Sequence, residues 1–200
     1  MTFSTEAEKT LYKLLEEGVS ASADSLAAVS HTQWTTQTLS ISTDGTESVE
    51  SVQARLSGDK SEHYGAFVSM SGAVFLLMLP KKDGPGLARD FFGGKSRRPG
   101  AVPPREEICI AEIANIVLNV ITNTLADACD DAFILSAPVM ILGKKGVLLK
   151  LALDELTNAG SAFAIMTYVS MSSPTLSSDC TVVLLLSPAC RSRILKALDQ

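Results

Sequence analysis

Apolar residues recur at helical spacing over two long stretches of the chain. The first runs from about Thr5 to Ala28, and Ser4 is placed to cap its amino end. The second runs from about Arg105 to Ala128 behind Pro103-Pro104, with two glutamates in its first turn, where the helix dipole favours acids. The pattern predicts two long amphipathic helices.

Shorter apolar runs predict strands. Two runs flank Asp44-Gly45, a dipeptide suited to a tight hairpin turn, and later pairs of apolar runs predict further hairpins. The predicted strands are 35–43, 49–56, 64–70, 73–79, 132–142, 162–171 and 181–186. Short helices are predicted over 87–92, 146–156 and 191–198.

The order of these elements occurs twice. The segments AVFLLMLPKKDGPGLARDFF and TVVLLLSPACRSRILKALDQ share an apolar strand, a proline at its end, a basic turn and a short helix. The stretch from Gly93 to Glu107 is dense in glycine, proline and charge, which is typical of a connecting loop. We therefore expect a single α+β domain over 1–200, made of two related halves (about 1–94 and 103–200) around a pseudo-twofold axis.

Composition narrows the class of protein. A chain of 200 residues that is 46% apolar and 20% charged can bury a sizeable core, which argues against disorder. A net charge of −5 argues against nucleic acid as the main partner. The N-terminus lacks the basic start and apolar run of a secretory signal, and no segment is typical of a membrane span, so we expect a cytoplasmic protein. The four cysteines, too widely spaced for a CxxC pair, are expected to be buried free thiols.

Three other patterns have simpler explanations than a functional site. The segment Gly84 to Arg89 resembles the start of a dinucleotide-binding loop, but Arg89 replaces the third glycine, so a proline-containing turn explains it. His31 and His63 lie in unrelated contexts without HExxH spacing. The stretch from Lys81 to Arg105 is strongly basic and is either a solvated loop or a landing surface for an acidic protein partner.

Three polar residues interrupt the second long helix. Glu112, Asn115 and Asn119 are spaced by three and four positions, so they lie along one ridge of the helix. An asparagine in a helix costs about half a kcal/mol relative to alanine, because its amide competes for backbone hydrogen bonds. A hydrated helix face or amides that cap neighbouring loops would explain the ridge, and so would a binding or catalytic face.

A longer motif connects this ridge to a known family. Glu112-x-x-Asn115, followed after twenty-two intervening residues by Pro138, resembles the signature of the CheC/CheX/FliY family of chemotaxis phosphatases. AEIANIVLNVITNTLADA resembles the family's second long helix, and TVVLLLSPACRSRILKAL its terminal strand and helix. The resemblance is weakest between Thr32 and Lys60. It implies a CheC-like α+β fold with pseudo-twofold symmetry, in which two long helices flank a continuous antiparallel sheet.

The resemblance also implies a function. Members of the family hydrolyse the aspartyl phosphate of a CheY-like response regulator, so a phosphorylated regulator is the expected partner. The metal ion belongs to the regulator, and we expect no cofactor or metal on this chain. Asn115 would aim the attacking water through its amide, and Glu112 would pair with a lysine of the regulator.

The same resemblance assigns roles to the neighbouring residues. Asn119 and Ile108 are expected to contact the regulator, although the family often has Asp or Ser at the position of Ile108, so one polar contact is missing. Pro138 is a structural member of the motif. A CheD-like protein is a further candidate partner, and both a monomer and a homodimer stay open.

The first half is predicted to lack a site of its own. Its long helix reads Glu16-Glu17-Gly18-Val19-Ser20, which aligns Val19 with Asn115, and Ser42 falls where the motif proline would lie. Valine cannot orient a water, so one site at most is expected, in the second half. The alternative function is a catalytically weak or inactive module of the same fold that senses or sequesters a regulator.

Overall fold

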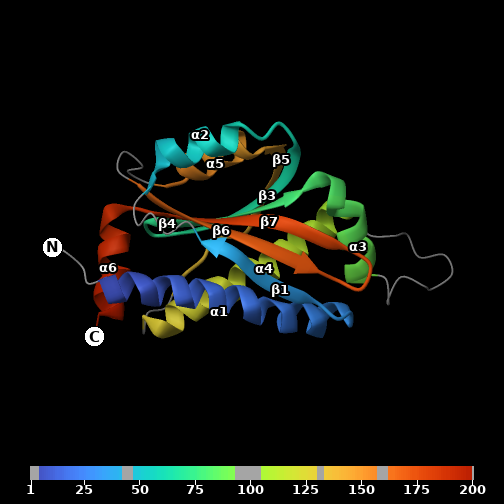
Figure 1. Ribbon diagram of the computed structural model, residues 1–200, viewed down its shortest axis with the longest axis horizontal. Helices are drawn as coiled ribbons and strands as arrows, with labels where there is room; N and C mark the ends of the chain where they lie inside the picture. Colours follow the sequence, from blue (N-terminus) through green and yellow to red (C-terminus); the bar gives the residue numbers. More distant parts are fainter. Residues whose placement is uncertain (1–4, 42–46, 93–104, 130–132, 157–161, 200) are drawn as a thin grey trace.

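The computed structural model describes residues 5–41, 47–92, 105–129, 133–156 and 162–199, which form one antiparallel sheet covered by helices on both faces (Figure 1). The first half of the chain supplies α1 (Thr5–Ser30), β1 (Thr35–Ile41), β2 (Glu47–Ser48), α2 (Val49–Ser57), β3 (Glu62–Met70), β4 (Ala73–Pro80), a 3-10 turn (Lys81–Asp83) and α3 (Gly84–Phe92). The second half supplies α4 (Glu106–Ala128), β5 (Val139–Lys144), α5 (Lys145–Asp154), β6 (Phe163–Ser172), β7 (Ser177–Leu186) and α6 (Pro188–Leu198).

The two halves interleave in the sheet. Six strands follow the order β1-β6-β7-β4-β3-β5, and β2 pairs with β6 beside β1. The first strand of each half pairs with the hairpin of the other half, since β1 lies on β6 and β5 lies on β3. If β1 is exchanged with β5, β6 with β3 and β7 with β4, the same strand order results, read in the opposite direction. Neither half holds a complete sheet without strands from the other.

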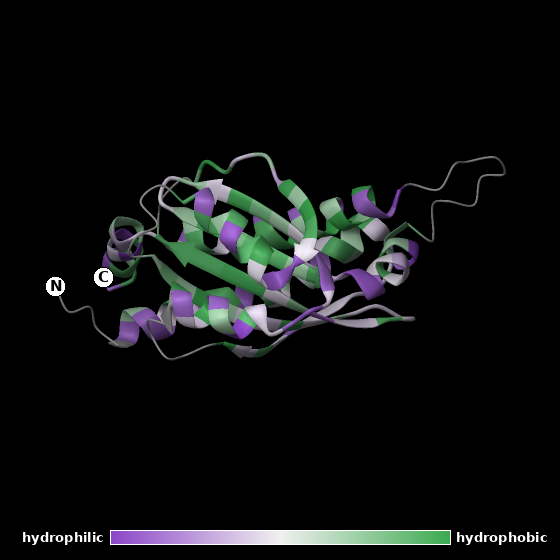
Figure 2. Ribbon diagram, turned by 90° about the horizontal axis from the view of Figure 1, so that it is seen from above, coloured by the Kyte–Doolittle hydropathy of each residue, from purple (hydrophilic) through white to green (hydrophobic). Residues whose placement is uncertain are grey.

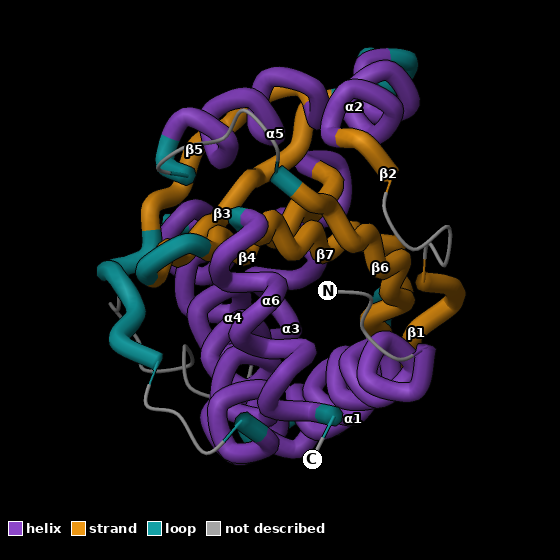
Figure 3. The backbone as a smooth tube through the Cα atoms, turned by 90° about the vertical axis from the view of Figure 1, so that its left-hand side faces the viewer, coloured by secondary structure: helices purple, strands orange, loops and turns teal. Residues whose placement is uncertain are grey.

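Two hydrophobic cores lie on opposite faces of this sheet. Successive side chains of a strand point to opposite faces, so in β4 Phe75 and Leu77 enter one core while Val74 and Leu76 enter the other. The first core lies beneath α1, α3, α4 and α6, and the second beneath α2 and α5. Figure 3 shows both long helices together on one face, with α2 and α5 on the other, and Figure 2 shows hydrophobic colour concentrated on the central strands.

Most of the predicted elements are confirmed, with two corrections. The predicted strand 49–56 is wrong: this segment is helix α2, whose three buried apolar residues recur at helical spacing and face the second core (Val49, Val52 and Leu56). The predicted strand 132–142 begins only at Val139. The preceding Pro138 has no N–H to donate to a strand ladder, which explains the late start. The predicted Ser4 cap, the Asp44-Gly45 turn and residues 93–104 of the predicted connecting loop lie outside the described residues, and the last two residues of that predicted loop, Glu106 and Glu107, begin α4.

Helix α4 is unusually apolar because it lies in the middle of the first core. Among the described helices it alone is long and apolar enough to cross a membrane. In the structure nine of its residues are buried instead, against the sheet and the neighbouring helices α1 and α3. Its composition therefore fits a central core helix.

A glycine allows the two long helices to meet closely. A Cβ atom at Gly18 of α1 would lie 2.9 Å from Cα of Ile121 in α4, which is closer than side-chain carbons approach backbone. The backbones of α1 and α4 can therefore approach closely only because position 18 has no side chain. This contact sets how closely α1 and α4 pack against each other.

We expect Gly18→Ala to lower the free energy of unfolding by about 1 to 2 kcal/mol, because the new methyl group must push the two backbones apart. The substitution would otherwise stabilise a helix interior by about 1 kcal/mol. Urea denaturation measures the change. Gly58→Ala is the matched control, since its Cβ would meet only Arg55 O at 3.4 Å, an ordinary contact. Equal stability of Gly18→Ala and wild type would contradict the close packing.

Candidate functional site

The residues of the predicted ridge lie together on the outer side of α4. Ile108 is 58% exposed, Glu112 is exposed, and Asn115 and Asn119 are half-buried. The opposite side of the helix is buried against the sheet and α1, so the ridge lies on a side of α4 that a partner protein can reach. Burial of both Glu112 and Asn115 would have excluded a role in contacting a partner, and neither is buried.

The two asparagines of the ridge are joined by a hydrogen bond. Nδ2 of Asn119 donates to Oδ1 of Asn115 across 3.1 Å, the contact expected one helical turn apart. The side chain of Glu112, one turn before Asn115, makes no hydrogen bond or ion pair with any other residue that the structure describes. The ridge thus presents one amide whose orientation is restrained and one carboxylate that is available to a cation.

Pro138 lies outside this ridge. It is exposed and directly precedes β5. The segment before it is held against the end of β3, where the Ser136 N–H donates to the carbonyl of Ser69 at 2.8 Å and the Ser69 N–H donates to Oγ of Ser136 at 3.0 Å. Pro138 therefore ends this connection where the regular pairing of β5 with β3 begins. No hydrogen bond between described residues joins it to the α4 ridge.

The structure corrects the alignment of the first half. Val19 is only 1% exposed, so it cannot be the counterpart of the half-buried Asn115. The buried positions of the two long helices match when Ala7 is aligned with Ile110, Leu11 with Ala114 and Leu15 with Leu118. In that alignment Tyr12 falls at the position of Asn115 and Lys9 at the position of Glu112. The first half lacks the Glu-x-x-Asn pair in this alignment as well.

Comparisons with known proteins match this architecture. No family model and no curated protein matches the sequence. Among solved structures, FliY from Thermotoga maritima superposes with a TM-score of 0.69 at 14% identity, covering 99% of this chain and 98% of that one. A chain of the FliG–FliM complex from H. pylori gives 0.57 at 12% identity, covering 96% and 99%. CheX from Desulfovibrio desulfuricans gives 0.50 at 10% identity, covering 88% and 99%.

The chain has the CheC/CheX/FliY-type fold. The α+β class and the pseudo-twofold order predicted from the repeated elements, and the continuous antiparallel sheet implied by the family resemblance, are confirmed. The placement of the long helices is more specific than predicted, since α1 and α4 pack against each other on one face of the sheet. In this fold the Glu-x-x-Asn ridge lies on the outer side of α4.

Other candidate groups in this CheC-type fold have structural roles. The Gly84-Pro85-Gly86 sequence forms the first turn of α3, and a Cβ at Gly84 would collide with the carboxylate of Glu106. The space beside this turn is therefore filled by an acidic side chain, which disfavours a bound phosphate. Cys109, Cys180 and Cys190 are buried free thiols and Cys129 is partly exposed. Burial raises the pKa of Cys180 to about 12, so this thiol is not a nucleophile.

The described surface also carries a hollow of about 470 Å³, away from the ridge. It is lined by Ser61, Glu62, Pro80, Lys81, Lys82 and Pro85. Lys81 is paired with Glu62 at 2.7 Å across the β3–β4 hairpin. None of the α4 residues lines this hollow. Within the described ranges, no three His, Cys, Asp or Glu side chains cluster as metal ligands would.

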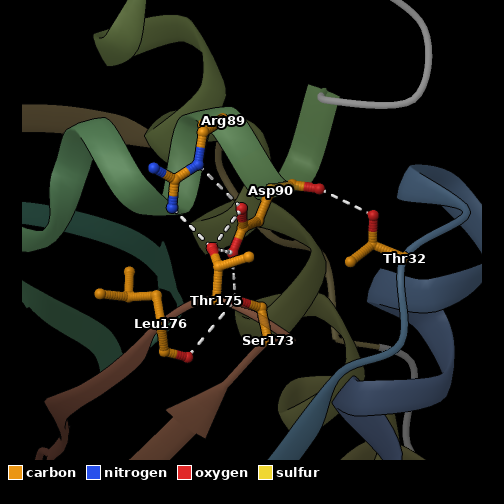
Figure 4. A network of polar contacts seen from close by, with 6 residues as sticks. All are labelled: Thr32, Arg89, Asp90, Ser173, Thr175 and Leu176. Carbon is orange, nitrogen blue, oxygen red and sulfur yellow. Dashed lines mark hydrogen bonds and ion pairs between the residues drawn. The ribbon is translucent and has the colours of Figure 1, made fainter.

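A polar network that the sequence did not indicate surrounds Asp90 near the end of α3 (Figure 4). The buried Asp90 carboxylate accepts hydrogen bonds from the hydroxyls of Ser173 and Thr175 and from Nε of Arg89. Its backbone carbonyl accepts from Oγ1 of Thr32 at 2.8 Å. The network ties α3 to the β6–β7 turn and to the segment between α1 and β1. The Asp90 carboxylate is satisfied by groups of the protein itself, so its role is structural.

Acid is expected to weaken this network. Burial alone would raise the pKa of Asp90, but the bonds from Ser173, Thr175 and Arg89 outweigh it and hold the pKa below the ordinary value. A lowered folded-state pKa stabilises the fold above the ordinary carboxyl value of about 3.9, and this contribution is lost as the pH falls through the folded-state pKa.

We expect Asp90→Asn to lower the free energy of unfolding by about 2 kcal/mol at neutral pH, because charge-assisted hydrogen bonds become neutral ones. Below about pH 4 the gap between variant and wild type should narrow. Urea denaturation at several pH values tests both. Asp127→Asn removes an exposed charge from α4 and is the control. An unchanged stability of Asp90→Asn, or a gap independent of pH, would contradict the role of the network.

Proposed function

We propose that this chain is a cytoplasmic chemotaxis protein that binds a phosphorylated CheY-like response regulator and hydrolyses its aspartyl phosphate. The observation that carries the proposal is the exposed ridge of α4, where a restrained amide, Asn115, lies one turn from Glu112, an exposed carboxylate with no side-chain partner among the described residues. The fold that this chain shares with FliY and CheX supports it. The proposal needs no metal or cofactor on this chain.

The chemistry requires little from the phosphatase itself. An aspartyl phosphate is an activated acyl phosphate, and the regulator supplies the metal ion and the charged pocket around it. Water attacks phosphorus, the bond to the aspartyl oxygen breaks, and inorganic phosphate and the free carboxylate result. The missing component is a water held in line with the breaking bond. The carbonyl of Asn115 accepts a hydrogen bond from that water, and its amide N–H groups face the phosphoryl oxygens.

The neighbouring residues of the ridge would bind the regulator. The Glu112 carboxylate has no partner among the described residues, so pairing with a lysine of the regulator breaks no side-chain contact within that part of the chain. Ile108, one turn earlier and 58% exposed, would add an apolar contact at the edge of the interface. The net charge of −5 disfavours nucleic acid, and a CheD-like protein is a second candidate partner.

Two substitutions separate the roles of the ridge. We expect Asn115→Ala to lower kcat by about 100-fold with little change in KM, because the water loses its alignment. Glu112→Ala should raise KM about fivefold with kcat nearly unchanged, because an interface ion pair is lost. Steady-state release of phosphate from the phosphorylated regulator measures both. Asn123→Ala, on the same helix and exposed, is the control. If each substitution changed kcat and KM by the same factor, these assignments would be wrong.

A binding function without hydrolysis is the second candidate. The chain of the FliG–FliM complex shows that this fold also occurs in a protein assembly, and the apolar Ile108 lies where the family often has a polar residue. A module of this kind would sense or sequester the regulator. Titration of regulator binding with wild type and Asn115→Ala distinguishes the two candidates. Binding by both proteins with no hydrolysis by wild type would favour the second.

A further inference from the structure

We infer that Asn119 is a positioning residue for Asn115: its side-chain amide fixes the orientation of the Asn115 amide on the surface of α4. The inference rests on the proposed function for its chemical consequence, but the contact itself is a property of the free protein. The sequence predicts contact between Asn119 and the partner, and that contact stays a prediction. The structure adds a hydrogen bond from the Asn119 side chain to a neighbour on the same helix.

The geometry of the pair carries the inference. Nδ2 of Asn119 donates to Oδ1 of Asn115 at 3.1 Å, a normal hydrogen-bond length. If the Asn115 amide alone turned over, its own N–H groups would face those of Asn119 and the bond would be lost. The amide of Asn115 therefore cannot reverse by itself without losing an interaction. The hydrogen bond thus restrains the rotation of the Asn115 amide, which would rotate freely without it.

The surroundings of Asn119 give its side chain no other role that the structure describes. Its backbone carbonyl accepts from Oγ1 of Thr122, which also donates to the carbonyl of Leu118, so these contacts belong to the helix backbone. The side chain of Asn119 bonds, among the described residues, to Asn115. Asn119 is half-buried, and partial burial limits competition from water for this bond.

The restraint has a chemical consequence at the proposed site. With one lone pair of Oδ1 taken by Asn119, the second lone pair of Asn115 remains for the attacking water, and both N–H bonds remain for phosphoryl oxygens. The orientation is set before the regulator binds, so it need not be acquired during the reaction. Asn119 thereby acts through Asn115 and does not itself touch the reacting atoms.

The kinetic test uses two matched positions on the same helix. Asn119→Leu removes the donor, and Asn123→Leu places the same side chain one turn further on, where Asn123 is exposed. Leucine is the better helix former at both positions, so both variants should fold, which circular dichroism checks. We expect kcat to fall about tenfold in Asn119→Leu with KM unchanged, and neither to change in Asn123→Leu. Asn119→Gln, which keeps an amide donor, should recover part of the lost kcat.

A second measurement is independent of activity. In the free protein, the side-chain amide signals of Asn115 in a ¹⁵N NMR spectrum should shift in Asn119→Leu and stay in place in Asn123→Leu. Unchanged Asn115 signals in Asn119→Leu would overturn the contact. Equal kcat in the two leucine variants, with wild type active, would overturn the positioning role alone. Absence of activity in wild type would overturn the proposed function and, with it, the catalytic consequence of the contact.

Discussion

The close contact between the two long helices is the constraint on which the rest of the structure depends. Because Gly18 has no side chain, α1 and α4 lie against each other on one face of the sheet, and their inner sides close the larger core. Strands from the two halves interleave, so this helix pair spans a sheet to which both halves contribute. One side of α4 remains uncovered, and this side carries the polar ridge. The position of the candidate site therefore follows from how the core is closed.

The polar ridge interrupts a helix that is otherwise mostly apolar. Nine residues of this helix are buried, and its hydropathy alone would suit a membrane span. Against that background, Glu112, Asn115 and Asn119 stand out as polar groups whose bonds do not hold the fold together. Asp90 is the opposite case: its buried carboxylate bonds to the β6–β7 turn, and its backbone carbonyl bonds to Thr32 in the segment between α1 and β1. Both are polar clusters, but the Asp90 network serves stability while the ridge is open to a partner.

The sequence predicted the elements and the ridge that depend on the spacing of nearby residues. The long helices and the later hairpins follow from apolar periodicity, and the ridge follows from spacings of three and four. The same reasoning mistook α2 for a strand, because a short segment with valines at its start fits both periods until the buried residues are known. It aligned Val19 with Asn115 because residue letters do not show which side of α1 is buried. The Asp90 network joins residues 83 and 85 positions apart, a separation at which no sequence spacing signals contact.

The most direct test of the account is the rate of phosphate release from a radiolabelled phospho-aspartyl regulator with Mg²⁺, measured with and without the wild-type chain. The account predicts release that is faster than spontaneous hydrolysis and that saturates as the concentration of regulator rises. The same rate with and without the chain, over a panel of CheY-like regulators, would contradict a phosphatase. The ridge of α4 would then be a binding surface only.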